Sequence, residues 1–174
     1  MKKILQTAMA GFLIMLVACN DGSSNKTEDD IKTDTSTVSN DVGTPATDNV
    51  MTQTALPLGS DQEVPVNKST ANGTADVSYN KETKMLTYTV NWTGLTNKAT
   101  MAHIHGPAPR GANAGVKHDL TGVLKKETSG NFTDSVKIDA SDIREDSLLM
   151  GHYYFNIHTA ANPGGEIRGQ IEFK

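Results

Sequence analysis

Apolar and polar residues alternate along several stretches of this 174-residue chain. Within residues 73–79, Ala75, Val77 and Tyr79 alternate with polar side chains. Residues 86–92 repeat the pattern, and their apolar positions are Leu86, Tyr88, Val90 and Trp92. A period of two residues is typical of a strand with one buried face and one polar face. The polar residues between the two stretches predict that they form a β-hairpin.

The C-terminal part of the chain contains two further stretches of this kind, residues 152–158 and 166–173. Pro163 and the glycines that follow it separate the two stretches and are typical of a turn. The pattern therefore predicts a second hairpin with one apolar and one polar face. If its turn is centred near Pro163, His158 is expected to lie opposite Arg168 on the polar face.

Weaker strand patterns cover residues 116–120 and 131–138. From residue 139 to residue 150, a capping aspartate and an acidic first turn predict a short helix, which Gly151 would close. Seven or eight strands with one short helix predict an all-β fold. We expect an antiparallel β-sandwich or a small Greek-key barrel.

The first 19 residues differ from the rest of the chain. Lys2 and Lys3 precede an apolar run over residues 4–16, and small residues lead to Cys19, the only cysteine. This pattern predicts an export signal, because the run is shorter than the ~20 residues of a membrane-spanning helix. The segment ending at Cys19 resembles the lipobox of bacterial lipoproteins, which implies cleavage before Cys19 and acylation of its thiol. The protein is therefore expected to be exported and anchored by lipid to a bacterial membrane, on the periplasmic side or at the cell surface.

Composition divides the remaining chain into two parts. Residues 20–51 are polar and contain no aromatic side chain, which predicts a disordered tether. Residues 52–174 have the length of one domain with a single core. The formal net charge of −4, together with the lack of a basic stripe with interleaved aromatics, argues against nucleic-acid binding.

The candidate chemistry centres on His103 and His105. In a strand, their side chains would leave the same face, roughly 6.5–7 Å apart at their Cα atoms, which suits chelation. His158 also falls on an expected polar face. Imidazoles bind divalent transition metals, and copper has the highest place in the affinity order. We therefore expect these three histidines to bind a metal, with copper favoured, and we consider His118 and His152 as candidates to complete the site.

The same histidines have an alternative role in the fold. A buried hydrogen-bond network with Asn156, Thr159 and Glu166 would tie two strands together. In the metal interpretation, Asn156 and Glu166 would support the ligands, and Arg168 would attract an anion. Alternatively, Arg168 would form an ion pair with a carboxylate such as Glu166 or Glu172. No residue pattern predicts a catalytic serine or a catalytic carboxylate pair.

Six short blocks follow one another through the domain, at residues 62–65, 71–75, 86–88, 102–108, 154–159 and 162–171. Two of them contain the candidate ligands, as Ala-His-Ile-His-Gly-Pro-Ala at 102–108 and Tyr-Phe-Asn-Ile-His-Thr at 154–159. In this order the blocks resemble the CHRD domain, the module first described in chordin. The resemblance covers nearly all of the expected domain and implies an antiparallel β-sandwich.

A second and weaker resemblance is to the copper/zinc superoxide dismutases, which are also antiparallel sandwiches with a His-x-His pair on one strand. It implies that His103, His105 and His158 are copper ligands and that Arg168 guides an anionic substrate. However, this chain lacks the cysteines of that family's disulfide, and only residues 107–115 stand in place of its long loop of zinc ligands. These departures argue against a zinc site and against dismutase activity.

We therefore expect a lipid-anchored CHRD-domain binding protein of the cell envelope, rather than an enzyme. Its expected partners are the membrane, through the lipid on Cys19, a copper or other transition-metal ion, and an envelope protein. One alternative is a dismutase-like copper oxidoreductase that uses the same histidines. The other is a structural or protein-binding module in which the histidines only support the fold.

Overall fold

The computed structural model describes residues 49–174. The export signal, Cys19 and most of the expected tether lie outside the described residues. Eight strands, one short α-helix and one 3-10 helix follow in the order β1 Val50–Gly59, 3-10 helix Ser60–Gln62, β2 Asn72–Asn80, β3 Met85–Thr93, β4 Ala99–His105, β5 Val116–Asp119, β6 Gly130–Lys137, α1 Glu145–Leu149, β7 Tyr153–Thr159 and β8 Ile167–Ile171.

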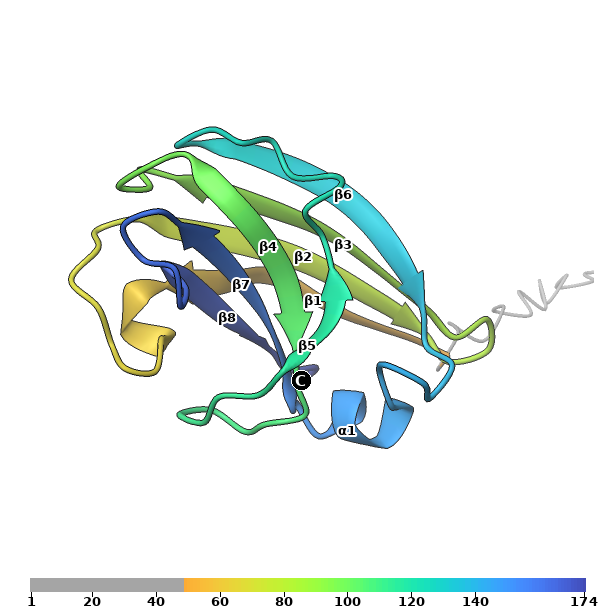
Figure 1. Ribbon diagram of the computed structural model, residues 1–174. Coiled ribbons are helices and arrows are strands. Elements are labelled where there is room, and N and C mark those ends of the chain that lie inside the picture. Colours follow the sequence, from red (N-terminus) through yellow and green to blue (C-terminus); the bar gives the residue numbers. More distant parts are fainter. Residues whose placement is uncertain (1–48) are drawn as a thin grey trace, which may run out of the picture. The chain divides into compact units, whose positions relative to one another are not determined.

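All neighbouring strands are antiparallel and form one sheet in the order β5-β4-β7-β8-β1-β2-β3-β6. The sheet curls, so that its two halves face each other across the interior (Figure 1). The aromatic rings of Tyr88 on β3 and Phe155 on β7 lie 5.2 Å apart at their centroids, although several strands separate β3 from β7 in the sheet order. This contact joins the two halves and confirms the expected all-β sandwich.

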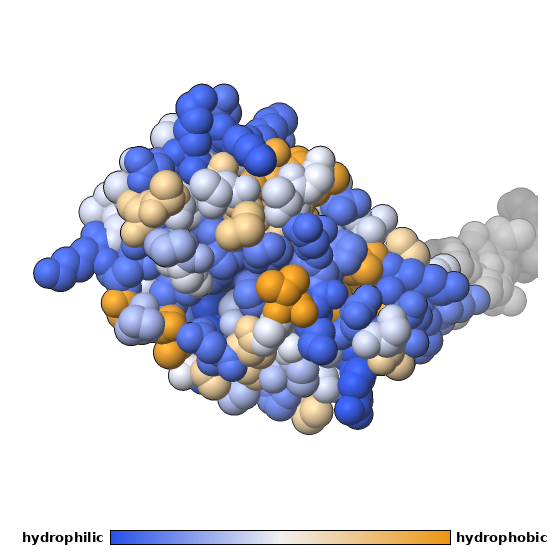
Figure 2. Space-filling view, viewed as in Figure 1, coloured by the Kyte–Doolittle hydropathy of each residue, from blue (hydrophilic) through white to orange (hydrophobic). Residues whose placement is uncertain are grey.

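The alternation of apolar residues correctly located β2 and β3. Every apolar position expected to point inward there is buried: Ala75, Val77, Tyr79, Leu86, Tyr88, Val90 and Trp92. The weaker patterns over residues 116–120 and 131–138 correspond to β5 and β6. On the face shown in Figure 2, apolar residues are scattered among polar ones, as expected when the large apolar side chains are gathered in the interior.

Strand β1 was not predicted. It begins at Val50, so it includes the last two residues assigned to the tether. Its alternation is interrupted by a β-bulge between Gln53 and Leu56, where Ala55 has a φ of 51°. Only Leu56 and Leu58 of this strand are buried in the core. The bulge and the few apolar residues hide the period of two that a strand prediction needs.

Helix α1 is shorter than predicted, because it begins at Glu145 rather than near Asp139. The carboxylate of Asp139 accepts hydrogen bonds from the backbone N–H and the hydroxyl of Ser141. This aspartate therefore closes a local turn and caps no helix. Gly151, with a φ of 73°, follows the helix as expected. Among residues 49–174, no helix is long and apolar enough to cross a membrane.

The polar face of β7 and β8 is buried, whereas the sequence pattern predicted that the polar side chains of β8 point outward. Gln170 donates hydrogen bonds to the backbone carbonyls of Ala108 and Gly151, and its side chain is covered by the loop after β4. Asn67, in the loop before β2, donates to the carbonyls of Gly165 and Glu166. Two loops therefore cover this face and enclose polar side chains that a half-exposed sheet would leave in water.

Candidate metal centre

Strand β4 presents two histidines on the face of the sheet opposite to the core. Ala102 and Ile104 are buried in the core, so the alternation of the strand directs His103 and His105 to the other face. Strand β7 pairs with β4, and its polar positions lie on that same face. His158 comes from this set, and the register therefore brings it to the histidine pair.

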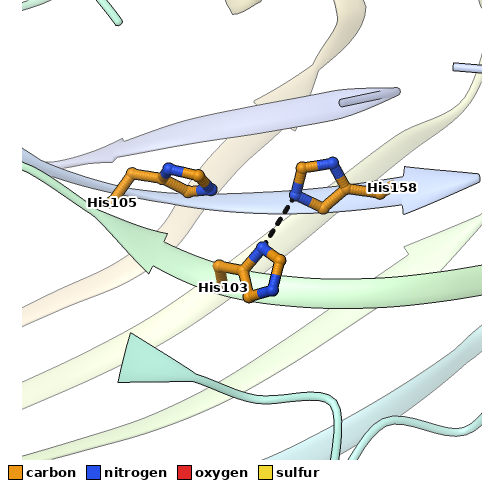
Figure 3. Close-up of side chains that lie close together, drawn as sticks. All are labelled: His103, His105 and His158. Atoms are coloured by element: carbon orange, nitrogen blue, oxygen red, sulfur yellow. Dashed lines mark hydrogen bonds between the residues drawn. The ribbon is translucent and has the colours of Figure 1, made fainter. Parts of the chain in front are cut away.

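The three imidazoles converge. One possible ligand atom from each of His103, His105 and His158 lies within 4.8 Å of the other two. The closest pair is His103 Nδ1 and His158 Nε2, which are 3.0 Å apart and hydrogen-bonded (Figure 3). The ring centroids of His103 and His105 are 5.3 Å apart. These distances place three nitrogen donors around one small volume.

The other ring nitrogens face oxygen atoms outside this volume. His105 Nδ1 lies 3.0 Å from the carbonyl oxygen of Ala114, and His158 Nδ1 lies 3.0 Å from that of Pro163. Because a carbonyl oxygen only accepts hydrogen bonds, both Nδ1 atoms carry the proton and both Nε2 atoms carry a lone pair. His103 Nε2 lies 3.8 Å from an oxygen of Asp119. This arrangement matches metal-bound histidines, which usually donate their second ring N–H to an oxygen.

One ring nitrogen of the cluster has a lone pair that accepts no hydrogen bond from the described residues. His105 Nε2 is buried and has no hydrogen-bond partner within the described part of the chain. A buried polar atom without a partner costs about 1–3 kcal/mol of stability. Such an atom in a native structure calls for an explanation, and a ligand that the structure does not contain is one of the recognised explanations.

Burial keeps all three imidazoles in the neutral form that binds metals. It lowers the pKa of His158 to about 4, an effect only partly opposed by the hydrogen bond to Pro163. It also lowers the pKa of His103, against the attraction of Asp119, and the pKa of His105, against the hydrogen bond to Ala114. At neutral pH the lone pairs are therefore not blocked by extra protons.

Tyr154 supports the cluster from the side of His105. Its ring is stacked on the His105 ring with an interplanar angle of 6° and a centroid distance of 5.1 Å. Its hydroxyl accepts a hydrogen bond of 3.1 Å from the backbone N–H of Ala114, the residue whose carbonyl binds His105. The guanidinium of Arg168 lies 3.4 Å from the centroid of the Tyr154 ring on β7. Tyr154 thus positions both the ring of His105 and the oxygen that orients it.

Arg168 does not lie opposite His158, so the predicted register of the last hairpin was wrong. Arg168 pairs with Asn156, two residues earlier on β7. Its guanidinium donates to Gln170 at 2.9 Å and to Asn113 at 3.4 Å. The expected ion pair with Glu166 or Glu172 is absent from the described residues, and Arg168 is only 1% exposed.

The residues of the alternative hydrogen-bond network are separate from the histidines. Asn156 donates to Glu63 at 2.8 Å, and within residues 49–174 its side chain forms no hydrogen bond with a histidine. Glu166 instead accepts from the side chains of Ser69, Thr96 and Thr159. Burial alone would raise the pKa of Glu166, but these hydrogen bonds hold it at about 2. Of the hydrogen-bond network predicted for the structural alternative, the described part of the cluster contains only the bond between His103 and His158.

The two additional candidate ligands lie outside the cluster. His118 on β5 pairs with Ile104, a core residue, and therefore faces away from His103 and His105. His152 precedes β7, where its carbonyl accepts a hydrogen bond from Ala108. Within residues 49–174, the converging group consists of His103, His105 and His158.

Sequence reasoning missed several residues around the cluster. The sequence pattern assigned no role to Tyr154, Asp119 or Ala114. Their positions depend on the pairing of β4 with β5 and on the loop between these strands. Met101, which lies near the cluster, could have been found from the sequence. It precedes His103 by two positions, and a strand directs both side chains to one face.

The fold and the cluster together define an all-β domain that carries three histidines on one face of a curled antiparallel sheet. A family model described as the CHRD domain matches residues 54–171. The match covers more than half of the chain, which therefore belongs to the CHRD domain family, as the six sequence blocks predicted. Searches of curated proteins and of solved structures found no significant match.

Proposed function

We propose that this CHRD domain binds one transition-metal ion, with copper favoured, through His103 Nδ1, His105 Nε2 and His158 Nε2. The observation that carries the proposal is that one ring nitrogen from each of the three histidines lies within 4.8 Å of the others, and that His105 Nε2 is buried without a hydrogen-bond partner in the described part of the chain. A bound cation would satisfy that atom. It would also take the place of the proton on His103 Nδ1 in the bond to His158, and that proton would move to His103 Nε2, which lies 3.8 Å from Asp119.

The donor set supports copper. Three neutral imidazoles are suitable ligands for several divalent metals, and Cu(II) has the highest intrinsic affinity in the first-row series. Ala114 and Pro163 accept the outer N–H groups of two rings, which fixes the tautomers required for binding. The rings of His105 and His158 are thus oriented before the metal arrives, which reduces the entropy lost on binding, whereas His103 Nδ1 has to give up its hydrogen bond to His158.

We place this binding domain in the cell envelope, anchored to a bacterial membrane by lipid on Cys19. Support comes from the positive N-terminus, the short apolar run and the position of the single cysteine. With Cys19 acylated, no thiol remains for a metal site, which is consistent with a ligand set of nitrogens. In this setting the protein would act as a binding protein for metal ions and for an envelope protein.

The test is a titration of the metal-free full chain, purified in detergent, with Cu(II) and Zn(II). Metal analysis and electron paramagnetic resonance should show one equivalent of Cu(II) with nitrogen hyperfine structure. His103→Ala should abolish this uptake. The matched control is His152→Ala, because His152 lies outside the cluster, and it should bind like the wild type. Absence of uptake, or full uptake by His103→Ala, would refute the proposal.

A further inference from the structure

Met101 lies on the same face of β4 as the histidine cluster. It precedes His103 by two residues, and Ala102 between them is buried in the core. The pairing of β4 with β7 is irregular between Ala99 and Met101. Beyond this irregularity, Met101 is paired directly with His158. The side chain of Met101 therefore has one ligand beside it on its own strand and another opposite it on β7.

This pairing brings the thioether within reach of the cluster. Side chains directly opposite each other in an antiparallel pair have their Cβ atoms about 4.5–5.5 Å apart. The hydroxyl of Thr100 donates to the carbonyl of His158 at 3.1 Å, which ties the two strands together beside this pair. Met101 is also flexible, because its unbranched side chain has three rotatable bonds. The sulfur can thus move toward an ion held by His158 without a backbone change.

Exposure distinguishes Met101 from an ordinary core methionine. It is 39% exposed, whereas large apolar residues are more often buried. Its position therefore leaves the sulfur free to bind an ion at the edge of the cluster. The only cysteine of the chain, Cys19, lies in the export segment. Methionine is thus the sole source of sulfur ligands in the described part of the chain, and Met101 is the one paired with a cluster histidine.

We propose that Met101 Sδ is the fourth ligand of the site and makes it selective for soft monovalent ions, Cu(I) and its analogue Ag(I). Soft thioether sulfur favours Cu(I), whereas three imidazoles alone favour divalent ions. The inference rests on the proposed metal site and adds the oxidation state of the ion that the site retains. Zn(II), which prefers nitrogen, oxygen and thiolate ligands, should gain nothing from Met101.

The first experiment measures Cu(I) affinity of the full chain in detergent, without oxygen, by competition with a chromophoric chelator. Met101→Leu keeps a similar volume and removes the sulfur. It should weaken Cu(I) binding by at least about tenfold, equivalent to about 1.4 kcal/mol, while Cu(II) affinity changes much less. The matched control is Met150→Leu, because Met150 is also exposed, at 61%, and follows α1. It should leave both affinities unchanged.

The second experiment detects the sulfur directly. Methionine methyl groups are labelled with carbon-13, and one equivalent of Ag(I) is added. The methyl resonance that Met101→Leu removes should shift in the wild type and should not shift in His103→Ala. If the wild type binds Cu(I) but Met101→Leu binds it equally well, or if Cu(I) and Cu(II) affinities fall together, Met101 is not a selective ligand although the histidine site stands. If the wild type binds neither copper ion, the proposed function itself fails.

Discussion

The imidazoles of His103 and His158 form a direct hydrogen bond, 3.0 Å from Nδ1 to Nε2, between two neighbouring strands. His158 Nδ1 donates to Pro163, so His158 Nε2 is the acceptor and His103 Nδ1 is the donor. The pair is therefore locked in one tautomeric state in the absence of metal. The same two atoms are proposed to bind copper, so loss of this bond and uptake of metal are linked.

His103→Ala should destabilise the metal-free protein. It leaves His158 Nε2 without its donor, and such a loss costs about 1–3 kcal/mol in the free energy of unfolding. Urea denaturation in the presence of a chelator would measure the change. His152→Ala, outside the cluster, should alter stability by no more than about 0.5 kcal/mol. Equal stability of His103→Ala and the wild type would show that the bond contributes nothing to the fold.

The pH dependence of stability should reveal His158. Its pKa falls from 6.5 in the unfolded chain to about 4 in the fold, so the unfolded chain binds more protons between these values. The contribution of His158 to the free energy of unfolding should therefore be fully present above pH 6.5. It should decrease by about 3 kcal/mol as the pH falls to 4. His158→Gln should remove this contribution, as measured by urea denaturation at pH 7 and pH 4.5.

Glu63 should change the stability of the fold in the direction opposite to His158 over the same pH range. Burial raises its pKa from 4.5 to about 7, although Arg168 and the hydrogen bond from Asn156 act in the other direction. Between these pH values the folded protein keeps a proton on Glu63 that the unfolded chain releases. The contribution of Glu63 to the free energy of unfolding therefore decreases as the pH rises from 4.5 to 7. Glu63→Gln should be more stable than the wild type at pH 8, by about 3 kcal/mol. An unchanged or lower stability at pH 8 would contradict this assignment.

Tyr154→Phe should weaken metal binding without disrupting the fold. Phenylalanine keeps the ring stacked on His105 but loses the hydroxyl contact with Ala114, whose carbonyl orients His105. Changes to residues that orient metal ligands typically lower affinity by about 10–100-fold, and a smaller loss is expected here because the ring remains. Calorimetric titration with Cu(II) would measure the effect.

A matched control for Tyr154→Phe is available in the neighbouring residue. The hydroxyl of Tyr153 accepts a hydrogen bond from the backbone of Arg144, away from the cluster. Tyr153→Phe should therefore reduce stability by about 1 kcal/mol and leave copper affinity unchanged. Equal effects of the two variants on copper affinity would show that Tyr154 has no specific role in the site.

Cys19→Ser should release the protein from the membrane fraction. Serine cannot be acylated through a thiol, so the predicted lipid anchor would be lost. Fractionation of cells and labelling with a tagged fatty acid would follow the protein. The wild type should be labelled and sediment with membranes. Continued labelling of Cys19→Ser would refute the lipoprotein prediction.

The sequence by itself determined the local features of this protein. Alternation of apolar residues is a property of each strand, and it correctly located β2 and β3 and placed His103 and His105 on one face of β4. The six blocks correctly indicated the CHRD family. These features depend on neighbours within a few residues, which is why they could be predicted without the fold.

Only the tertiary structure decided how distant segments meet. The register of β7 and β8 pairs Arg168 with Asn156, and loops bury the polar face on which the histidines lie. The same long-range pairing brings His158 and Met101 to one place and leaves His118 on the opposite face. Register and loop cover result from packing of the whole sheet, because a small slip changes which side chains are neighbours while the local alternation stays the same.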